Sequence, residues 1–416
     1  MLTVPQAVAE ITKDITPRDV ERVPLLDSLG LVLAMSALAR YTLPQWDNSA
    51  MDGYAVRAAD IEGASPEAPV ILPVLETVAA GGFASRAIKA GEAMRIMTGA
   101  PLPEGADTVV RVEDTDHGTE RVEIRNTRDA RKNIRPRGED FREGSTVIAA
   151  GTPLGAAQLG VLASLGYADV PVYRRPVVAI AGSGDELVDI DQFDEVVAGR
   201  KIVASNRYTL DALVRQAGGI PKHLGNAADT EESLRAVLEQ SRGADVLVTS
   251  AGASVGEYDY TRKVLESLGA ELRFWRVRMR PGAPLGFGTL DGMPWIGLPG
   301  NPVSAMVTFE LFARPVIRRM LGHTRLFRRA VAATLEEPVA IGARLTHFLR
   351  AITRVGDDGT LSVRLTGPQG SGILTSMSQA NALLVVPDDR ARVEAGERLN
   401  VIPLSEDAQL SEAFSL

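Results

Sequence analysis

Between residues 176 and 322 the sequence alternates between short apolar runs and stretches with helical spacing, and this restricts the fold more than any other feature. Apolar runs of this length are typical of buried strands, and an amphipathic segment follows each of them. We therefore expect a three-layer α/β domain with a mostly parallel sheet, whose ligands bind at the carboxyl ends of the strands. The expected strands are residues 177–181, 220–224 and 246–249, and the expected helices are 208–217, 231–241, 258–268 and 302–321.

The segments on either side follow other patterns. A short amphipathic helix is expected at residues 3–15, and a second helical piece at 23–40 around Leu25, Leu29 and Leu33. Short strands at 70–74, 93–97, 108–112 and 122–124 indicate a β-rich lobe, and alternation after residue 322 indicates a C-terminal β-barrel-like domain. The expected fold class is multidomain α/β plus β. Its expected parts are an α/β domain (1–20 and 176–324), a helical or mixed linking domain (21–44 and 143–175), the β-rich lobe (45–142) and the C-terminal domain (325–416).

The composition excludes several kinds of site. The 416 residues include no Cys and four His, so a disulfide framework, a thiolate metal site and a His-rich metal site are not expected. A site of carboxylates and other oxygen ligands for a hard cation such as Mg²⁺ stays open. The net charge of −8 argues against general nucleic-acid binding. Because no apolar run could span a membrane and no export signal is visible at the N-terminus, we expect a cytoplasmic protein.

The most informative segment for function runs from Asp245 to Tyr260. A short apolar strand is followed by small residues at 249–256 and then by a stretch with helical spacing. Backbone N–H groups at such a strand-to-helix turn bind anions, and the nearby carboxylates Glu257 and Asp259 suggest a metal-bridged phosphate or oxyanion. From these residues alone, a plain turn that uses small residues for close packing is an equally good interpretation.

Other polar groups fall at the same edge of the expected sheet. Asp185 and Glu186 follow its first strand, whereas Asp229 is either a ligand contact or the cap of the helix at 231–241. Asn301 is expected at the N-cap of a second helix on this edge, with Pro302 at its first position. Three alternating arginines are expected on one face of one strand, where an anion would offset their repulsion: Arg276, Arg278 and Arg280.

Six ordered motifs together resemble the molybdopterin molybdenumtransferases, that is, the bacterial MoeA proteins and the E-domain of gephyrin. The motifs are residues 47–55, 98–107, 137–140, 184–187, 250–259 and 297–304, and the resemblance covers nearly the whole chain. It implies that adenylylated molybdopterin and molybdate are converted to molybdenum cofactor and AMP with Mg²⁺. It further implies an elongated homodimer with its active site between subunits, supplied by a molybdopterin adenylyltransferase and serving cofactor-accepting molybdoenzyme machinery.

The resemblance also assigns roles to individual residues. It implies catalytic roles for Asp52, Glu186, Asp229 and Asp259, of which Glu186, Asp229 and Asp259 would be linked to the metal. The residues that it implies for binding of cofactor or substrate are Thr98, Asp140, Ser250, Gly252, Ser254, Gly256, Arg276, Arg280, Pro299, Asn301, Ser304, Arg350 and Ser371.

The sequence departs from the family pattern at three alanines. The family commonly has Lys where Ala283 stands, Gly where Ala251 stands and Val where Ala253 stands. An alanine at position 283 cannot grip an oxyanion, so the choice between molybdate and tungstate stays open. Two other functions are considered: a nucleotide pyrophosphatase on the same α/β domain, and a non-enzymatic scaffold that keeps the dimer.

Overall fold

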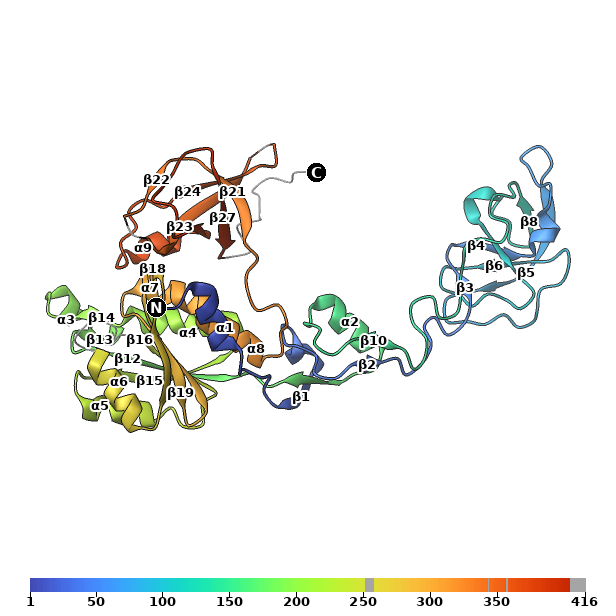
Figure 1. Ribbon diagram of the computed structural model, residues 1–416. Helices are drawn as coiled ribbons and strands as arrows, with labels where there is room; N and C mark the ends of the chain where they lie inside the picture. Colours follow the sequence, from blue (N-terminus) through green and yellow to red (C-terminus); the bar gives the residue numbers. More distant parts are fainter. Residues whose placement is uncertain (251–257, 343, 357, 405–416) are drawn as a thin grey trace. The chain divides into compact units, whose positions relative to one another are not determined.

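The computed structural model describes residues 1–250, 258–342, 344–356 and 358–404, with the backbone path alone for 258–260. These residues form two compact units (Figure 1). The first unit comprises residues 1–34, 151–155 and 169–416, and the second comprises 35–150 and 156–168. The four domain boundaries expected from the sequence stay a prediction.

The core of the first unit is a six-stranded sheet. Its strand order is β15 (Ile220–Ala227), β12 (Val177–Ser183), β16 (Val246–Ser250), β20 (Met293–Leu298), β19 (Pro284–Leu290) and β17 (Glu271–Arg276). The first four strands are parallel, β19 is antiparallel to its neighbour β20, and β17 is antiparallel to β19. All five residues of β16 are buried, as the apolar run in the sequence requires of a central strand. The mostly parallel sheet is therefore confirmed.

Helices cover both faces of this sheet, which confirms the three layers. Helices α5 (Glu231–Glu239) and α6 (Tyr258–Ser267) share a buried core with Ala179, Ala181 and Trp295 of the sheet. Helix α4 (Ser205–Ala217) packs with α7 (Pro302–Thr308) and α8 (Arg314–Met320), and α1 (Val4–Thr12) also contacts α8. The π-helical turn η5 (Phe309–Ala313) joins α7 to α8. Pro315 lacks the N–H that would otherwise continue the regular bonding from this turn.

A closed five-stranded barrel follows, as expected. Its strands pair in the order β23 (Thr346–Val355), β24 (Leu361–Leu365), β21 (Val331–Leu335), β27 (Arg398–Pro403) and β25 (Ala382–Val386), and β25 pairs back with β23. Closure pairs the backbone groups that an open sheet would leave at its edges. The short strand β18 (Met279–Arg280) joins β23, and smaller elements are β22 (Val339–Ala340), β26 (Arg392–Val393) and α9 (Leu374–Gln379).

The second unit contains the β-rich lobe that the sequence predicts. Its main sheet has the order β7 (Thr108–Arg111), β4 (Gly53–Val56), β6 (Ala93–Ile96), β5 (Val70–Val78) and β8 (Arg121–Ile124). Smaller elements are β2 (Ala37–Leu38), β3 (Asn48–Ser49), β9 (Ile134–Arg135), β10 (Thr146–Ile148), η2 (Ala58–Ile61), η3 (Val112–Asp114) and α2 (Ala156–Ser164). In the part of the chain that the structure describes, no helix is long and apolar enough to cross a membrane.

The helix expected at residues 23–40 is wrong. The chain there forms β1 (Val20–Pro24), paired with β11 (Asp169–Tyr173), then the 3₁₀ turn η1 (Leu25–Ser28) and an extended segment. Gly30 has φ of +78°, which ends any helix, and the three consecutive residues that follow it (31–33) are all buried. Pairing with β11 thus outweighs the helical spacing of the leucines.

A buried carboxylate ties the start of the large sheet together. Asp245, which is 9% exposed, accepts hydrogen bonds from both terminal nitrogens of Arg174 at 2.9 Å and from the Val177 N–H at 2.7 Å. Burial by itself would raise the pKa of Asp245, but the bonds from Arg174 and Val177 outweigh it, so the pKa is lowered.

This depressed pKa predicts a dependence of stability on acid. The ionised form stabilises the fold above the unfolded pKa of about 3.9, and this stabilisation is lost as the pH falls through the lower folded pKa. We expect the free energy of unfolding of Asp245→Asn to be roughly 3 kcal/mol lower than that of the wild type at neutral pH. Below about pH 4 the stability of the variant should fall less steeply with acid than that of the wild type, because asparagine does not titrate. Urea denaturation between pH 3 and 7 measures both effects, with the exposed Asp194→Asn as the matched control. An unchanged pH profile in Asp245→Asn would contradict the assignment.

Candidate functional site

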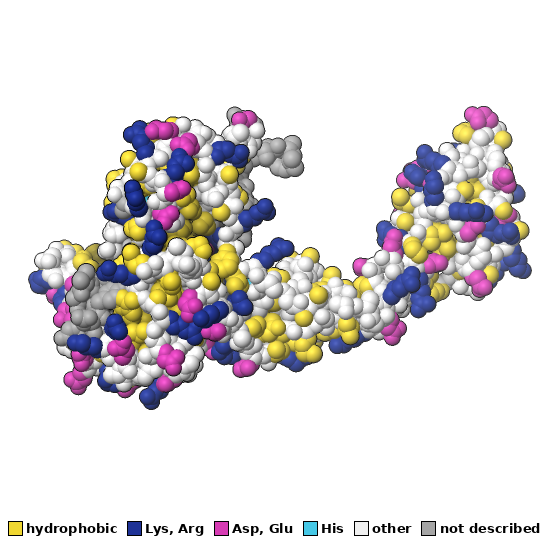
Figure 2. Space-filling model, viewed as in Figure 1, with side chains coloured by type: hydrophobic (Ala, Val, Ile, Leu, Met, Phe, Trp, Pro, Cys, Tyr) yellow, Lys and Arg dark blue, Asp and Glu magenta, His cyan; other side chains and the backbone are white. Residues whose placement is uncertain are grey.

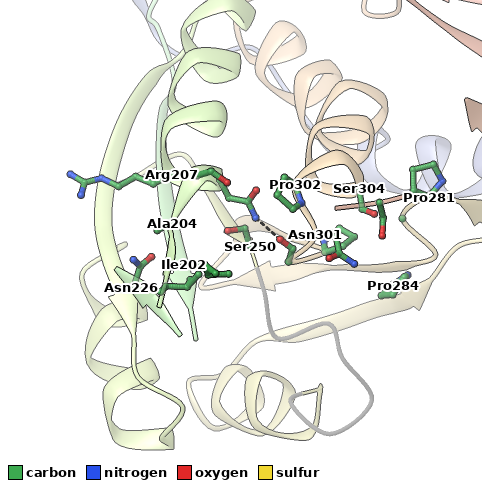
Figure 3. A pocket seen from close by; sticks show the side chains of 18 of the residues that line it. Ile202, Ala204, Arg207, Asn226, Ser250, Pro281, Pro284, Asn301, Pro302 and Ser304 are labelled. Carbon is green, nitrogen blue, oxygen red and sulfur yellow. Dashed lines mark hydrogen bonds between the residues drawn. The ribbon is translucent and has the colours of Figure 1, made fainter. Parts of the chain in front are cut away.

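A cavity of about 580 Å³ opens at the carboxyl ends of β12, β16 and β20 in the first unit (Figure 3). This is the edge at which ligands of parallel sheets bind. Seven of the residues that the sequence analysis selects line this cavity: Glu186, Ser250, Arg280, Pro299, Asn301, Ser304 and Ser371. The structure therefore brings residues from three of the six motifs (184–187, 250–259 and 297–304) to one place, together with Arg280 and Ser371.

Two glycines shape the floor of the cavity beside β12. A Cβ atom at Gly182 would lie 2.2 Å from Oδ1 of Asn226, so the Asn226 side chain covers this glycine. Gly184 has φ of +140°, and a Cβ there would lie 2.6 Å from a carboxylate oxygen of Glu186. Glycine at both positions is therefore required for the side chains of Asn226 and Glu186 to reach their places.

The start of α7 forms the opposite wall. Asn301 stands at the N-cap position as expected, but its side chain makes no capping hydrogen bond, so its amide stays available to a ligand. Nδ2 of Asn206, on α4, donates to the carbonyl oxygen of Gly300 at 2.7 Å and holds this loop (Figure 3). Ser304, one turn into α7, is 4% exposed and also lines the cavity.

The predicted face of three arginines is wrong. Strand β17 ends at Arg276 and β18 begins at Met279, so the three arginines do not belong to one strand. Arg278 donates to a carboxylate oxygen of Asp388 at 2.9 Å, which already satisfies its charge. Of the three, Arg280 alone lines the cavity. Two buried residues between them, Val277 and Met279, produce the alternation seen in the sequence.

Asp229 is not the helix cap that the sequence allows. Thr230 is the N-cap of α5, and its side chain accepts a hydrogen bond from the Ser233 N–H. The carboxylate of Asp229 instead accepts a 3.3 Å bond from the Asp185 N–H, and the Asp229 N–H donates to the Asp185 carboxylate at 3.1 Å. These reciprocal bonds join the loops after β12 and β15, and Asp229 does not line the cavity.

The expected metal triad is incomplete among the residues with described side chains. No group of three or more His, Asp or Glu side chains lies close enough to hold one ion within that set. Glu186 lines the cavity, whereas the carboxylate of Asp229 accepts a hydrogen bond from the Asp185 N–H. The side chain of Asp259 lies outside the described residues. Gly252, Ser254 and Gly256, and the substituted Ala251 and Ala253, also lie outside the described residues.

Arg350 contacts the loop that forms one wall of the cavity and does not line the cavity itself. Its side chain is fully buried, and the guanidinium donates to the carbonyl oxygens of Gln369 (3.2 Å) and Gly370 (2.9 Å) and to Oγ of Ser376 (2.9 Å). The next residue, Ser371, lines the cavity, and its carbonyl oxygen accepts the Val303 N–H of α7 at 3.2 Å. Burial lowers the pKa of Arg350. Arg350 is thus a positioning residue.

Three of the motifs converge in the second unit. Oδ1 of Asp52 accepts the Thr98 N–H at 2.7 Å and the Thr98 hydroxyl at 2.8 Å, and these bonds lower the pKa of Asp52. Oδ1 of Asp47 accepts the Arg137 N–H at 2.6 Å, which ties down the loop that leads to Asp140. Asp140 itself lines a separate groove beside α2. The two predicted residues Asp52 and Thr98 therefore form a direct pair.

The cavity residues that sequence reasoning missed include Asn206, His223 and Asn226. None belongs to a recognisable phosphate or metal motif. His223 and Asn226 lie on the edge strand β15, where the register with β12 shifts at Leu224. The side chains of residues three apart on a regular strand point to opposite faces. The bulge at Leu224 therefore lets the side chains of both His223 and Asn226 line the same cavity.

Comparisons with known proteins agree along the whole chain. The family model for the MoeA N-terminal region (domain I and II) matches residues 2–166, that for a probable molybdopterin binding domain matches 179–319, and that for the MoeA C-terminal region (domain IV) matches 332–404. Molybdopterin molybdenumtransferase 2 of Mycobacterium tuberculosis strain H37Rv is 38% identical over 406 residues, which are 96% of this chain and 98% of that protein. Molybdopterin molybdenumtransferase of Nostoc sp. is 37% identical over 394 residues, covering 93% of this chain and 89% of that protein.

The fold agrees with a solved structure from the same group. The crystal structure of the molybdopterin biosynthesis MoeA protein from Pyrococcus horikoshii OT3 superposes with a TM-score of 0.83 at 28% identity, covering 97% of this chain and all of that one. Order of the motifs, architecture and full-length similarity thus point the same way. The chain belongs to the MoeA family of molybdopterin molybdenumtransferases, which are transferases of molybdenum cofactor biosynthesis.

Proposed function

We propose that this protein inserts molybdate into adenylylated molybdopterin and releases AMP in a reaction that requires Mg²⁺. The observation that supports this most strongly is the cavity at the carboxyl ends of β12, β16 and β20. It gathers Glu186, Arg280, Asn301 and Ser304 around a space large enough for a nucleotide-sized ligand. Cleavage of a phosphoanhydride bond in such a cavity needs charge neutralisation and positioning more than a protein nucleophile.

The donor set fits Mg²⁺. This ion keeps several waters and is usually held by one or two carboxylates together with substrate phosphates. Glu186 supplies one carboxylate at the cavity, and Asp259 is the second candidate on α6. When bound, the ion would neutralise phosphate charge and make the AMP a better leaving group. Asn301 and Ser304 would orient the ligand by hydrogen bonds, and Arg280 would hold the oxyanion.

One assay separates this proposal from its two alternatives. The protein is incubated with adenylylated molybdopterin, Mg²⁺ and molybdate, and both AMP and protein-bound molybdenum are measured. A molybdenumtransferase releases AMP and binds molybdenum in equal amounts. A nucleotide pyrophosphatase releases AMP without incorporating molybdenum, and a scaffold does neither. Either of these last results would overturn the proposal. Replacing molybdate by tungstate in the same assay measures which oxyanion the protein prefers. This preference is of interest because Arg280 supplies one cation and Ala283 supplies no second one.

We also propose that the protein is a homodimer whose active site lies between the subunits. The first unit exposes apolar side chains on β1 and η1, where Val20 is 50%, Leu26 79% and Leu29 56% exposed. Figure 2 shows hydrophobic side chains at the surface in this region. An apolar surface of this kind is typical of a subunit interface. Asp52 and Thr98 of the second unit would then contribute to the partner's cavity.

The dimer predicts a change of mass. The double variant Leu26→Asp, Leu29→Asp is expected to elute as a monomer in size-exclusion chromatography with light scattering, because two buried charges without partners oppose association. The control is Phe327→Asp, which charges an exposed apolar residue outside this surface. A monomeric wild type, or a dimeric double variant, would contradict the proposed interface. We further propose a cytoplasmic location and contacts with a molybdopterin adenylyltransferase and with cofactor-accepting proteins.

A further inference from the structure

Positive charge is concentrated where the α/β domain continues into the barrel. Residues 311–335 contain six Arg and one His but no Asp or Glu, although the net charge of the whole chain is −8. They include α8, the connecting segment (residues 321–330) and β21, which begins the barrel (Figure 1). Like charges repel one another, so this concentration costs free energy unless negative charges lie beside it.

A single buried carboxylate serves the arginines of this segment in the part of the chain that the structure describes. Glu310 is 8% exposed, and its Oε1 accepts a hydrogen bond from Nε of Arg328 at 2.8 Å. Nη1 of Arg314 lies 3.6 Å from the same oxygen. Arg318 forms no ion pair with any described residue, and its Nε donates to a backbone carbonyl oxygen. Three guanidinium charges therefore face one carboxylate, which leaves two positive charges unbalanced.

Backbone acceptors hold these guanidinium groups close together. Arg314 donates to the carbonyl oxygen of Leu326 at 3.2 Å, and Arg318, one turn further along α8, donates to that of Arg325 at 3.3 Å. Both side chains thus reach consecutive residues of the connecting segment. Burial, and then the charges of Arg328 and Arg318, lower the pKa of Arg314 to about 10. The positive charges therefore repel one another in a place with little solvent.

His323 lies beside the same charges. Its backbone N–H donates to the carbonyl oxygen of Arg318 at 3.0 Å, directly after the last turn of α8. Burial, followed by the charges of Arg318 and Arg314, lowers the pKa of His323 to about 4. The ionisation of His323 consequently reports how much positive charge is left unbalanced nearby.

The end of α8 explains part of this arrangement. The carbonyl groups at a helix C-terminus attract cations, and Arg318 stands in the last turn of α8. This attraction does not reach Arg328, which belongs to the connecting segment and returns to Glu310. It also does not require three guanidinium groups to share one carboxylate. A missing negative charge accounts for all three.

We propose that Arg314, Arg318 and Arg328 bind a dianion of the phosphate type, which links α8 to the connecting segment. Phosphate or sulfate carries the two negative charges that Glu310 does not provide. Guanidinium groups suit such ligands because they donate paired N–H bonds to oxyanions. None of the three arginines lines the cavity, and the inference does not depend on the proposed function.

The first test measures the binding of inorganic phosphate to the full chain at pH 7 by calorimetry. Arg318→Gln is expected to weaken binding about tenfold or more, because charge-assisted hydrogen bonds are lost while both contacts of Glu310 stay in place. The matched control is Arg398→Gln, at an exposed position on β27, which should bind phosphate as the wild type does. Phosphoserine in place of phosphate distinguishes a site open to phosphate groups on larger molecules from one for the free ion. Binding of either probe that is lost in Arg318→Gln supports the proposal.

The second test locates the anion by NMR of the histidine rings, with the His323 signal assigned from its loss in His323→Gln. Sulfate is the probe because it stays a dianion at pH 4. At equal ionic strength, sulfate should raise the pKa of His323 clearly above its value of about 4 in chloride. This rise should persist in Arg280→Gln, which removes the cation of the cavity.

Three results would overturn the proposal. The first is a His323 pKa that is the same in sulfate and in chloride, together with no phosphate binding by the wild type. The second is undiminished phosphate binding by Arg318→Gln. The third is a sulfate effect that disappears in Arg280→Gln, which would place the anion in the cavity. The AMP-release assay is independent of all three, so its failure would refute the proposed function alone.

Discussion

Glu186→Gln is expected to reduce AMP release by about 100-fold or more while the protein stays folded. Glu186 is the carboxylate that lines the cavity among residues whose side chains are described, and its oxygens lie beside Gly184. The amide of Gln keeps the size of the side chain but carries no charge to hold a metal ion. Initial rates of AMP release over a range of Mg²⁺ concentrations measure the effect.

The matched control is Glu195→Gln on α3 (Phe193–Val197), where the carboxylate is bound to Arg200 and does not line the cavity. This variant should keep the wild-type rate. If Glu186→Gln retained full activity at low Mg²⁺, the assignment of Glu186 to the metal would be wrong. A rate recovered at high Mg²⁺ would support it, because weakened binding can be offset by concentration.

Arg350→Met is expected to destabilise the barrel by about 3–5 kcal/mol and to lower AMP release as well. Removing the guanidinium leaves the carbonyl oxygens of Pro368, Gln369 and Gly370 without their buried donors. The loop that they belong to carries Ser371, which lines the cavity and bonds to the start of α7. A loosened loop therefore weakens the site even though Arg350 does not line it.

Arg354→Met is the control that shows whether the loss of stability and activity is specific to the replacement of Arg350. Arg354 lies on the same strand, β23, but its side chain is exposed, so its replacement should change stability by less than about 0.5 kcal/mol. Denaturation in urea and AMP release are measured for both variants. A stable Arg350→Met protein with lost molybdate binding would contradict the positioning role and make Arg350 a direct ligand contact.

The sequence predicts the α/β domain well because its strands and helices carry their own periodic signals. The buried run that forms β16 is an example. The helix expected at residues 23–40 fails for a tertiary reason: pairing with β11, which is distant in the sequence, determines that segment. The local spacing of apolar residues does not show which distant strand a segment will pair with.

The candidate site is predicted in part for similar reasons. Ser250 ends β16, and Asn301 and Ser304 lie at the start of α7, which follows β20, so the topology of the sheet brings them to one edge. The sequence places Arg278 on a ligand-facing surface and makes Asp229 either a ligand contact or a helix cap, but each bonds to a partner far away in the sequence, Asp388 and Asp185 respectively. Asn226 and His223 could not be found from the sequence, because their common direction depends on a one-residue bulge in β15.

The most direct test of the central claim is the amount of AMP released from adenylylated molybdopterin with molybdate present or withheld, at constant Mg²⁺. If the cavity carries out molybdate insertion, release by the wild type should require molybdate, and the amount of AMP should rise with molybdate to a plateau of one AMP per adenylylated molybdopterin supplied. Release that is equally fast without molybdate would show hydrolysis of the nucleotide instead, and would contradict the account.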